Sequence, residues 1–207
     1  MSDSKSKILD RIKKAKSNTK LWEGVDKPST ENFFQSSDLS MIGLFKSKLD
    51  ELTANLLVVN SSTELHQALR SIFDSQSVSC FDVNLQSILN EADLNYVDSF
   101  DKKYTGFAFI SCEYAVARLG SIITSSALAS GRQLNVIPEH QVILVEKKQL
   151  IYNIEDAFED LPNRYENLPS FISIATGPSR TADIEKTLIL GAHGPKRMTV
   201  IYKNFED

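Results

Sequence analysis

Short apolar runs alternate with amphipathic helical segments over most of this 207-residue chain, and this alternation constrains the fold more than any other feature. The first run, 55–59, leads into polar residues in which Thr63 is placed to cap a helix over 64–73. A later run, 142–145, is wholly apolar and bounded by polar residues, as in a strand covered on both faces. The pattern therefore predicts an α/β fold in which helices cover both faces of a largely parallel sheet. Further strands are expected at 78–81, 107–110, 121–126, 171–175 and 198–202, and further helices at 41–52, 85–89 and 151–165.

The first 40 residues differ from the rest. Residues 1–20 form a charged amphipathic segment that predicts a helix, which either packs on its own domain, extends into solvent or binds a partner. Residues 21–38 are rich in Ser, Asp, Asn, Pro and Lys around three aromatic side chains, which is typical of an irregular strap. We therefore expect a helical arm and strap at 1–40 and an α/β domain at 41–207.

Charge and hydropathy exclude several classes of protein. The net charge is −4 and the isoelectric point is about 5.5. The chain therefore has no general electrostatic attraction to nucleic acid or to anionic membranes. No apolar stretch approaches the roughly 20 residues that span a bilayer, and the Lys-rich N-terminal segment lacks the apolar core of a signal peptide. These features predict a cytoplasmic protein without a membrane span.

Two cysteines, Cys80 and Cys112, predict reduced thiols rather than a disulfide framework. An iron–sulfur cluster usually takes four thiolates, so any such centre is expected in a partner subunit. No metal site is expected in this chain. The dinucleotide, Walker, esterase and zinc-protease signatures are also missing from the sequence.

The run from Ala175 to Glu185 carries the first candidate site. A strand enters Gly177-Pro178, where the chain turns sharply, and a helix is expected to start near Thr181. The free N–H groups of that helix, together with Arg180, are suited to bind a carboxylate or phosphate. Alternatively, Ser179 or Thr181 caps the helix while Asp183 and Glu185 complement its dipole, and those acids would weaken anion binding.

Histidines supply the second set of candidates. His193 lies between Gly191 and Gly194 just before the last strand, where an imidazole can act as a general acid or base or can simply stabilise the turn. His140 is expected at the start of a strand and suits either role. His66 falls within a predicted helix and is expected at the surface.

The segment from Cys112 to Ser121 is the third candidate. Glu113 follows a strand, which is a favourable position for a catalytic carboxylate, and Gly120 permits close backbone approach. The alternative is an exposed Glu at the start of a helix.

These motifs together resemble a known family. The string Ser179-Arg180-Thr181-Ala182-Asp183-Ile184-Glu185, followed by Gly191-Ala192-His193-Gly194-Pro195 and a terminal strand, resembles the lactate-utilisation protein C family, which carries the LUD domain. Glu113 to Ala117 leading to Gly120-Ser121, the Pro138 to Val142 segment and the N-terminal helix support the resemblance, which covers most of the chain. One departure is Arg118-Leu119 before Gly120, where relatives usually carry an acidic residue and Thr, so the resemblance does not fix the ligand chemistry near Gly120.

The resemblance implies a three-layer α/β/α fold similar to the sugar-phosphate isomerase and coenzyme A transferase group. It also implies a subunit of a system that oxidises L-lactate to pyruvate, alongside a cysteine-rich subunit and a ferredoxin-like iron–sulfur subunit. This agrees with the cysteine argument, because two thiols leave the chain dependent on partners for electron transfer.

The leading hypothesis is therefore a lactate-oxidation subunit that binds a small carboxylate. Arg180 would pair with the carboxylate, and His193 or His140 would transfer a proton. The alternatives are a stand-alone enzyme that uses Glu113 on a phosphorylated or coenzyme A substrate, and a non-catalytic scaffold that binds partners through the N-terminal helix. The full expected site consists of Glu113, His140 and His193 as catalytic residues, and Gly120, Ser121, Gly177, Ser179, Arg180, Thr181, Asp183, Glu185 and Gly194 as ligand-binding residues.

Overall fold

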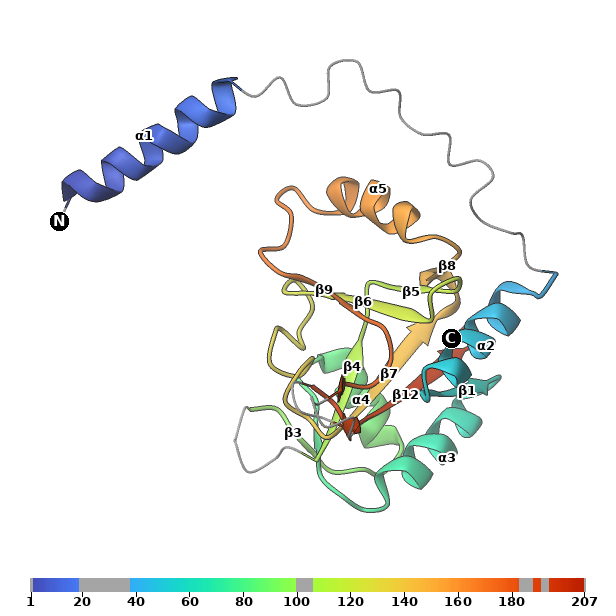
Figure 1. Ribbon diagram of the computed structural model, residues 1–207. Helices are drawn as coiled ribbons and strands as arrows, with labels where there is room; N and C mark the ends of the chain where they lie inside the picture. Colours follow the sequence, from blue (N-terminus) through green and yellow to red (C-terminus); the bar gives the residue numbers. More distant parts are fainter. Residues whose placement is uncertain (1, 19–37, 100–105, 183–187, 191–193, 207) are drawn as a thin grey trace. The chain divides into compact units, whose positions relative to one another are not determined.

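The computed structural model describes residues 2–18, 38–99, 106–182, 188–190 and 194–206 (Figure 1). The chain divides into two compact units, Met1–Ser36 and Ser37–Asp207. The first unit contains helix α1 (Ser2–Asn18), as the amphipathic pattern predicted, with Ile8, Leu9 and Ile12 exposed along it. The expected strap lies almost wholly outside the described residues.

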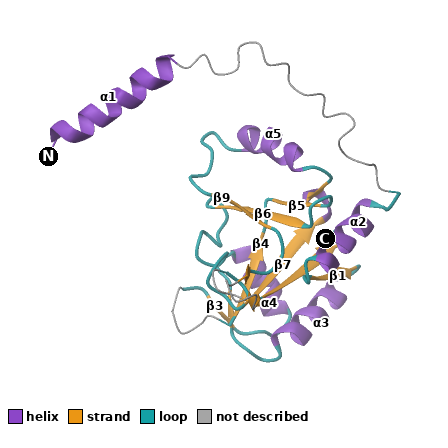
Figure 2. Cartoon of the chain, viewed as in Figure 1, coloured by secondary structure: helices purple, strands orange, loops and turns teal. Residues whose placement is uncertain are grey.

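A six-stranded sheet forms the centre of the second unit (Figure 2). All five strand pairings in this sheet are parallel, which confirms the predicted α/β class. The strand order is β1 (Asn55–Val59), β12 (Arg197–Lys203), β7 (His140–Glu146), β4 (Phe107–Ser111), β2 (Val78–Ser79) and β3 (Tyr96–Val97).

Both faces of this sheet are covered, and β7 shows how the sequence achieves it. Successive side chains of a strand point to opposite faces. Val142 and Leu144 accordingly pack with α3 (Ser62–Phe73) and α4 (Val83–Glu91) on one face. The alternate residues Ile143 and Val145 pack with Leu44, Phe45 and Leu49 of α2 (Met41–Glu51) on the other.

A second sheet, of four strands, shares the α2 face. It orders β8 (Leu150–Ile151), β5 (Tyr114–Val116), β6 (Ser121–Ser125) and β9 (Ile172–Ala175), with antiparallel pairing on both sides of β6. Ala115 and Ile122 face the main core, whereas Val116 and Ile123 face α5 (Ile154–Arg164). The sequence pattern indicated strands at 121–126 and 171–175 but assigned them to the main sheet, and it missed β5, which is too short to show alternation.

The expected helix start near Thr181 is wrong. Arg180–Ala182 forms strand β10, which pairs in antiparallel fashion with β11 (Leu188–Leu190). The apolar run 188–190 supplies a strand partner within a few residues, and a local hairpin satisfies the backbone groups that a helix would otherwise pair.

Two details complete the fold. The cap of α3 is Ser61, whose Oγ accepts from the Glu64 backbone N–H at 3.2 Å, rather than the predicted Thr63. Within the described residues, no helix is both long and apolar enough to cross a membrane.

Candidate functional site

Glu113 lies in the turn from β4 to β5, and its carboxylate is bound by three donors. Oε1 accepts from Ser125 Oγ at 2.5 Å and from the Tyr165 hydroxyl at 2.8 Å, and Oε2 accepts from Arg164 Nη1 at 3.1 Å. The residue is only 1% exposed. Burial of a carboxylate is tolerated when it is paired and hydrogen-bonded, as it is here. The predicted alternative of an exposed Glu at a helix start is wrong, because β5 follows and α5 covers it.

The network extends from Glu113 to α5. Arg164 Nη2 donates to the Tyr114 hydroxyl at 2.5 Å and lies 3.1 Å from Asp160 Oδ2. The Tyr114 hydroxyl in turn donates to Asp160. Burial, followed by the hydrogen bond to Asp160, raises the pKa of Tyr114 to about 12, so its hydroxyl stays protonated at neutral pH. These bonds join α5 to the second sheet.

Gly120 and Gly177 meet the C-terminal turn of α2. Their φ angles are +65° and +80°, in the left-handed region that favours glycine. A Cβ at Gly120 would lie 2.9 Å from Lys48 Cβ, and one at Gly177 would lie 2.9 Å from Leu52 Cβ. Next to them, the hydroxyls of Ser121 and Thr176 are 2.9 Å apart and link β6 to the end of β9.

Arg180 reaches the same turn of the chain. Its Nη2 donates to the Thr53 hydroxyl at 2.6 Å and to the Leu52 carbonyl. The guanidinium therefore joins the start of β10 to the segment between α2 and β1. This contact is structural, although it uses only part of the donor capacity of a guanidinium.

The two Gly-rich loops that the sequence singled out lie side by side. The Ser179 backbone N–H donates to the Pro195 carbonyl at 2.8 Å, and a Cβ on Gly194 would lie 3.2 Å from Ser179 Cβ. The backbone N–H groups of Lys196 and Arg197 both bind the Glu139 carbonyl. The structure thus gathers one set of predicted site residues near the starts of β1, β7 and β12. We call this set the amino-edge group: Gly120, Ser121, Gly177, Ser179, Arg180 and Gly194.

Three of the predicted site residues, Asp183, Glu185 and His193, lie outside the described residues. Thr181 belongs to β10 by its backbone, and its side chain also lies outside the described part of the structure.

His140 is the first residue of β7 and is 7% exposed. Its Nε2 lies 2.9 Å from Thr199 Oγ1, and its ring centroid is 5.1 Å from that of Phe107. Burial, and secondarily the positive charge of Arg197, lowers the pKa of His140 to about 4. The imidazole is therefore neutral at pH 7. It also lines a hollow of about 290 Å³ at the starts of β1, β7 and β12.

His140 and Glu113 do not share a site. Ser111, at the end of β4, is in register with Leu144, four residues after His140. At about 3.3 Å per residue this separates the two levels by roughly 13 Å along the sheet, and Glu113 follows beyond Ser111. The structure therefore separates Glu113 from His140.

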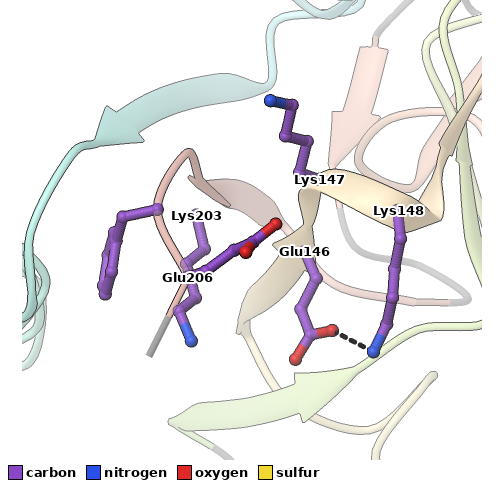
Figure 3. A pocket seen from close by; sticks show the side chains of 6 residues that line it. Glu146, Lys147, Lys148, Lys203 and Glu206 are labelled. Atoms are coloured by element: carbon purple, nitrogen blue, oxygen red, sulfur yellow. Dashed lines mark ion pairs between the residues drawn. The ribbon is translucent and has the colours of Figure 1, made fainter.

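A cavity that the sequence reasoning missed lies at the carboxyl ends of β7 and β12. It has a volume of about 410 Å³, and Glu146, Lys203 and Phe205 also line an adjoining hollow of about 300 Å³. Figure 3 shows Glu146 paired with Lys148 in that hollow, with Nζ and Oε2 2.8 Å apart. The wall opposite the strands comes from α3 and α4, through Ser62, Leu65, His66, Asn84, Leu85, Ser87, Ile88 and Glu91.

A signal for this cavity was present in the sequence. Ligands in parallel α/β sheets bind at the carboxyl ends of the strands. The residues just after the expected strands 55–59, 142–145 and 198–202 include Ser62, Glu146 and Lys203. Local sequence after Val59 predicts only a helix cap. His66, expected at the surface, lies beside the cavity with its Nε2 3.5 Å from Glu91 Oε2.

The two cysteines are buried and free, as expected for reduced thiols. Burial is the main reason why the pKa of the Cys80 thiol is raised to about 12. Burial also raises the pKa of the Cys112 thiol. Neither thiol is suited to act as a thiolate near neutral pH. Within the described residues, no three His, Cys, Asp or Glu side chains are arranged to hold a metal ion.

Comparison with known proteins shows what the chain is similar to. Residues 104–202 match the LUD domain. YkgG of Escherichia coli is 33% identical over 101 residues, which cover 47% of this chain and 43% of the relative. Lactate utilization protein C of Halalkalibacterium halodurans is 30% identical over 108 residues, which cover 51% of this chain and 46% of the relative. The chain thus matches less than half the length of these relatives.

A solved structure shows the same fold. A DUF162 family protein of Deinococcus radiodurans superimposes with a TM-score of 0.62 over 79% of this chain and 96% of that protein, at 18% identity. This similarity confirms the predicted fold. The sequence matches confirm the resemblance to the LUD domain and to lactate utilisation protein C that the motifs predicted.

Proposed function

We propose that this chain acts in lactate utilisation, in a system that oxidises L-lactate to pyruvate. The observation that carries the proposal is the LUD domain over residues 104–202 together with the similarity to proteins named lactate utilization protein C. The oxidation releases a pair of electrons. Because Cys80 and Cys112 are too few for a four-thiolate cluster, we place the iron–sulfur centres in cysteine-rich and ferredoxin-like partner subunits.

In this proposal the amino-edge group binds the carboxylate of the substrate. The guanidinium of Arg180 has five N–H donors, and Nη2 supplies the two that reach Leu52 and Thr53. Its remaining donors would bind the carboxylate. Ser179 precedes Arg180 in the sequence, and Gly194 lies next to Ser179 in the fold. The lowered pKa makes His140 a weak base at neutral pH, so the proton transfer is assigned to His193.

The alternative of a stand-alone enzyme with Glu113 as base or nucleophile receives less support. Three donors already occupy the Glu113 carboxylate, and α5 shields it from solvent. A substrate would have to displace Arg164 and Tyr165 before it could reach either oxygen. The scaffold alternative is favoured by the exposed apolar residues of α1 and is tested by truncation below.

Growth on L-lactate tests the proposed role. Deletion of the gene should abolish growth on L-lactate and leave growth on glucose unchanged, and a plasmid copy should restore it. An Arg180→Ala copy should fail to restore growth, whereas an Arg132→Ala copy, which alters a different exposed arginine, should succeed. Normal growth of the deletion strain on L-lactate would refute the role, and full complementation by Arg180→Ala would remove Arg180 from the site.

A further inference from the structure

The hollow beside His140 takes no part in the function proposed above. Its volume of about 290 Å³ lies just below the range of about 300 to 1,000 Å³ that is usual for drug-sized ligands, so it suits a smaller molecule. Ile72 of α3 lines one side, Lys46 and Asp50 of α2 line another, and the starts of β1, β7 and β12 supply the rest. None of the amino-edge group lines this hollow.

His140 brings an unsatisfied polar atom to the lining of this hollow. The residue is 7% exposed, and its Nε2 lies 2.9 Å from Thr199 Oγ1. Its Nδ1 is buried and has no hydrogen-bond partner among the described residues. A buried polar atom without a partner is unfavourable, and native proteins usually pair such an atom with protein, ordered water or a ligand. Because Thr199 already engages Nε2, Nδ1 is the ring nitrogen that remains for a ligand.

The protonation of the His140 ring determines which group of a ligand suits Nδ1. Burial, and secondarily the charge of Arg197, lowers the pKa of His140 to about 4, so the ring is neutral at pH 7. In a neutral imidazole one nitrogen donates and the other accepts, and the Thr199 hydroxyl can serve either tautomer. A ligand hydroxyl can likewise donate to Nδ1 or accept from it. A hydroxyl group is therefore the partner that fits Nδ1 in both tautomers.

The charges around the hollow compensate one another. Lys46 Nζ and Asp50 Oδ2 are 2.7 Å apart, and both side chains are more than half exposed. Arg197 is the neighbour of His140 in the register of β12 and β7, but it does not line the hollow and is exposed, so solvent screens its charge. The lining therefore has no net charge and favours an uncharged ligand over an ion.

The remaining lining adds an amide and an apolar surface. Asn55 is the exposed first residue of β1, and its side-chain amide can donate to a hydroxyl group and accept from one. Leu57 and Ile72 provide apolar surface that can pack against C–H groups. Several hydroxyl groups on a short carbon chain match this combination.

We propose that this hollow binds a small uncharged polyol, one of whose hydroxyl groups forms a hydrogen bond with Nδ1 of His140. The proposal rests on the hollow and on His140, and does not depend on the role in lactate utilisation.

Titration of the full chain with glycerol, erythritol and mannitol tests the site, and L-lactate serves as a charged hydroxylated probe. In NMR spectra at least one polyol should shift the imidazole nitrogen signals of His140 and the amide signals of Leu57 and Ile72. L-lactate at the same concentration should shift the His140 signals less. Unchanged His140 signals with all three polyols, or equal or larger shifts with L-lactate, would overturn the proposal.

Two tryptophan substitutions on β1 then locate the ligand. Leu57→Trp fills the hollow and should weaken polyol binding at least about tenfold. Val58→Trp is the matched control, because Val58 is similarly exposed, points to the opposite face of β1 and lines a different hollow. It should change the affinity less than about twofold. Equal effects of the two substitutions would place the ligand elsewhere and overturn the proposal.

Two substitutions of His140 identify the atom that binds. The amide of His140→Gln can replace Nε2 beside Thr199 but leaves nothing at Nδ1, so polyol binding should weaken at least about tenfold. The amide of His140→Asn can replace Nδ1 and should keep the affinity within about threefold. Equal affinities of the two variants would contradict the contact with Nδ1. If either variant fails to fold, the Leu57→Trp and Val58→Trp pair still decides the site.

Discussion

Glu113 is held by donors from two elements that are distant in the sequence. Ser125 comes from β6, and Arg164 and Tyr165 from the C-terminal end of α5. A carboxylate just after a strand is well placed to reach a substrate. In this fold the second sheet and α5 enclose the Glu113 carboxylate instead. Its surroundings therefore favour a structural role, in which one buried charge fixes the position of α5.

Arg164→Met should destabilise the protein, because it leaves the Glu113 carboxylate buried without its cation. Breaking a buried pair costs roughly 3 to 5 kcal/mol, and the partial exposure of Arg164 reduces this to about 2 to 3 kcal/mol. Urea unfolding measures the change. Lys46→Met, which breaks the exposed pair of Lys46 with Asp50, is the control and should change the free energy of unfolding by less than about 0.5 kcal/mol. An equal effect of the two substitutions would contradict the structural role of Glu113.

His140 should make the protein sensitive to acid. Its pKa is lowered from 6.5 to about 4 in the fold, so below pH 6.5 the unfolded chain binds a proton that the folded chain does not. The free energy of unfolding should therefore fall as the pH drops from 6.5 to 4, by up to about 1.4 kcal/mol per pH unit from this residue, and the effect should level off below pH 4. Arg197 adds to the effect, and Lys46 and Asp50 line the adjacent hollow.

The comparison with His140→Gln isolates this contribution. Glutamine keeps a polar group near Thr199 but does not titrate. Unfolding curves of both proteins between pH 4 and pH 8 should differ most in slope below pH 6.5. Parallel curves over this range would show that His140 titrates alike in both states.

The last turn of α2 is a junction for three other elements. Gly120 before β6, Gly177 after β9 and Arg180 of β10 all contact the segment from Lys48 to Thr53. Two glycines are required because a side chain at either position would meet atoms of α2. The packing of α2 thus sets the position of the loops that form the amino-edge group.

Gly177→Ala should disturb this junction. The new Cβ would lie 2.9 Å from Leu52 Cβ at a φ of +80°, so both strain and overlap should cost about 2 to 4 kcal/mol in thermal or urea unfolding. Gly131→Ala is the matched control, because Gly131 has a φ of +56° and nothing within 4 Å of its Cβ position. It should cost only about 1 kcal/mol, from the backbone conformation alone. If the two variants lose the same stability, the contact with α2 has no energetic weight.

The chain carries its charge unevenly. Residues 1–36 contain eight basic and five acidic residues, a net charge of +3, which leaves −7 on residues 37–207 because the total is −4. The exposed Ile8, Leu9 and Ile12 of α1 lie on this basic unit. Among the described residues, every member of the three hydrophobic clusters belongs to the second unit.

Residues 37–207 alone should therefore fold. Because the truncation removes no described residue of the clusters, the midpoint of thermal unfolding should stay within about 2 °C of that of the full chain. Co-expression with the candidate iron–sulfur subunits then tests the scaffold alternative. Loss of co-purification on truncation would show that α1 carries the contact, and unchanged co-purification would exclude it. A large fall in the unfolding midpoint would contradict the independence of the second unit.

Periodicity was enough to place five of the six strands of the main sheet and the helices that cover it, but it missed the two-residue strand β3. The run 55–59 coincides with β1, and the apolar run 142–145 lies within β7, because a strand covered on both faces must be apolar throughout. The motifs around Gly177 and His193 were also sufficient to find the LUD resemblance. Local sequence carries this information because burial sets the pattern of apolar residues within each element.

Tertiary structure alone decided which side chains meet. Four strands of two to five residues built a second sheet, since pairing between distant segments compensates for weak local signals. Arg180 was expected at a helix start and instead lies in strand β10, because this segment pairs with β11. Glu113 and His140 were expected in one site but lie at different levels of the sheet. The direction and register of a strand depend on the strands beside it, and these come from other parts of the sequence.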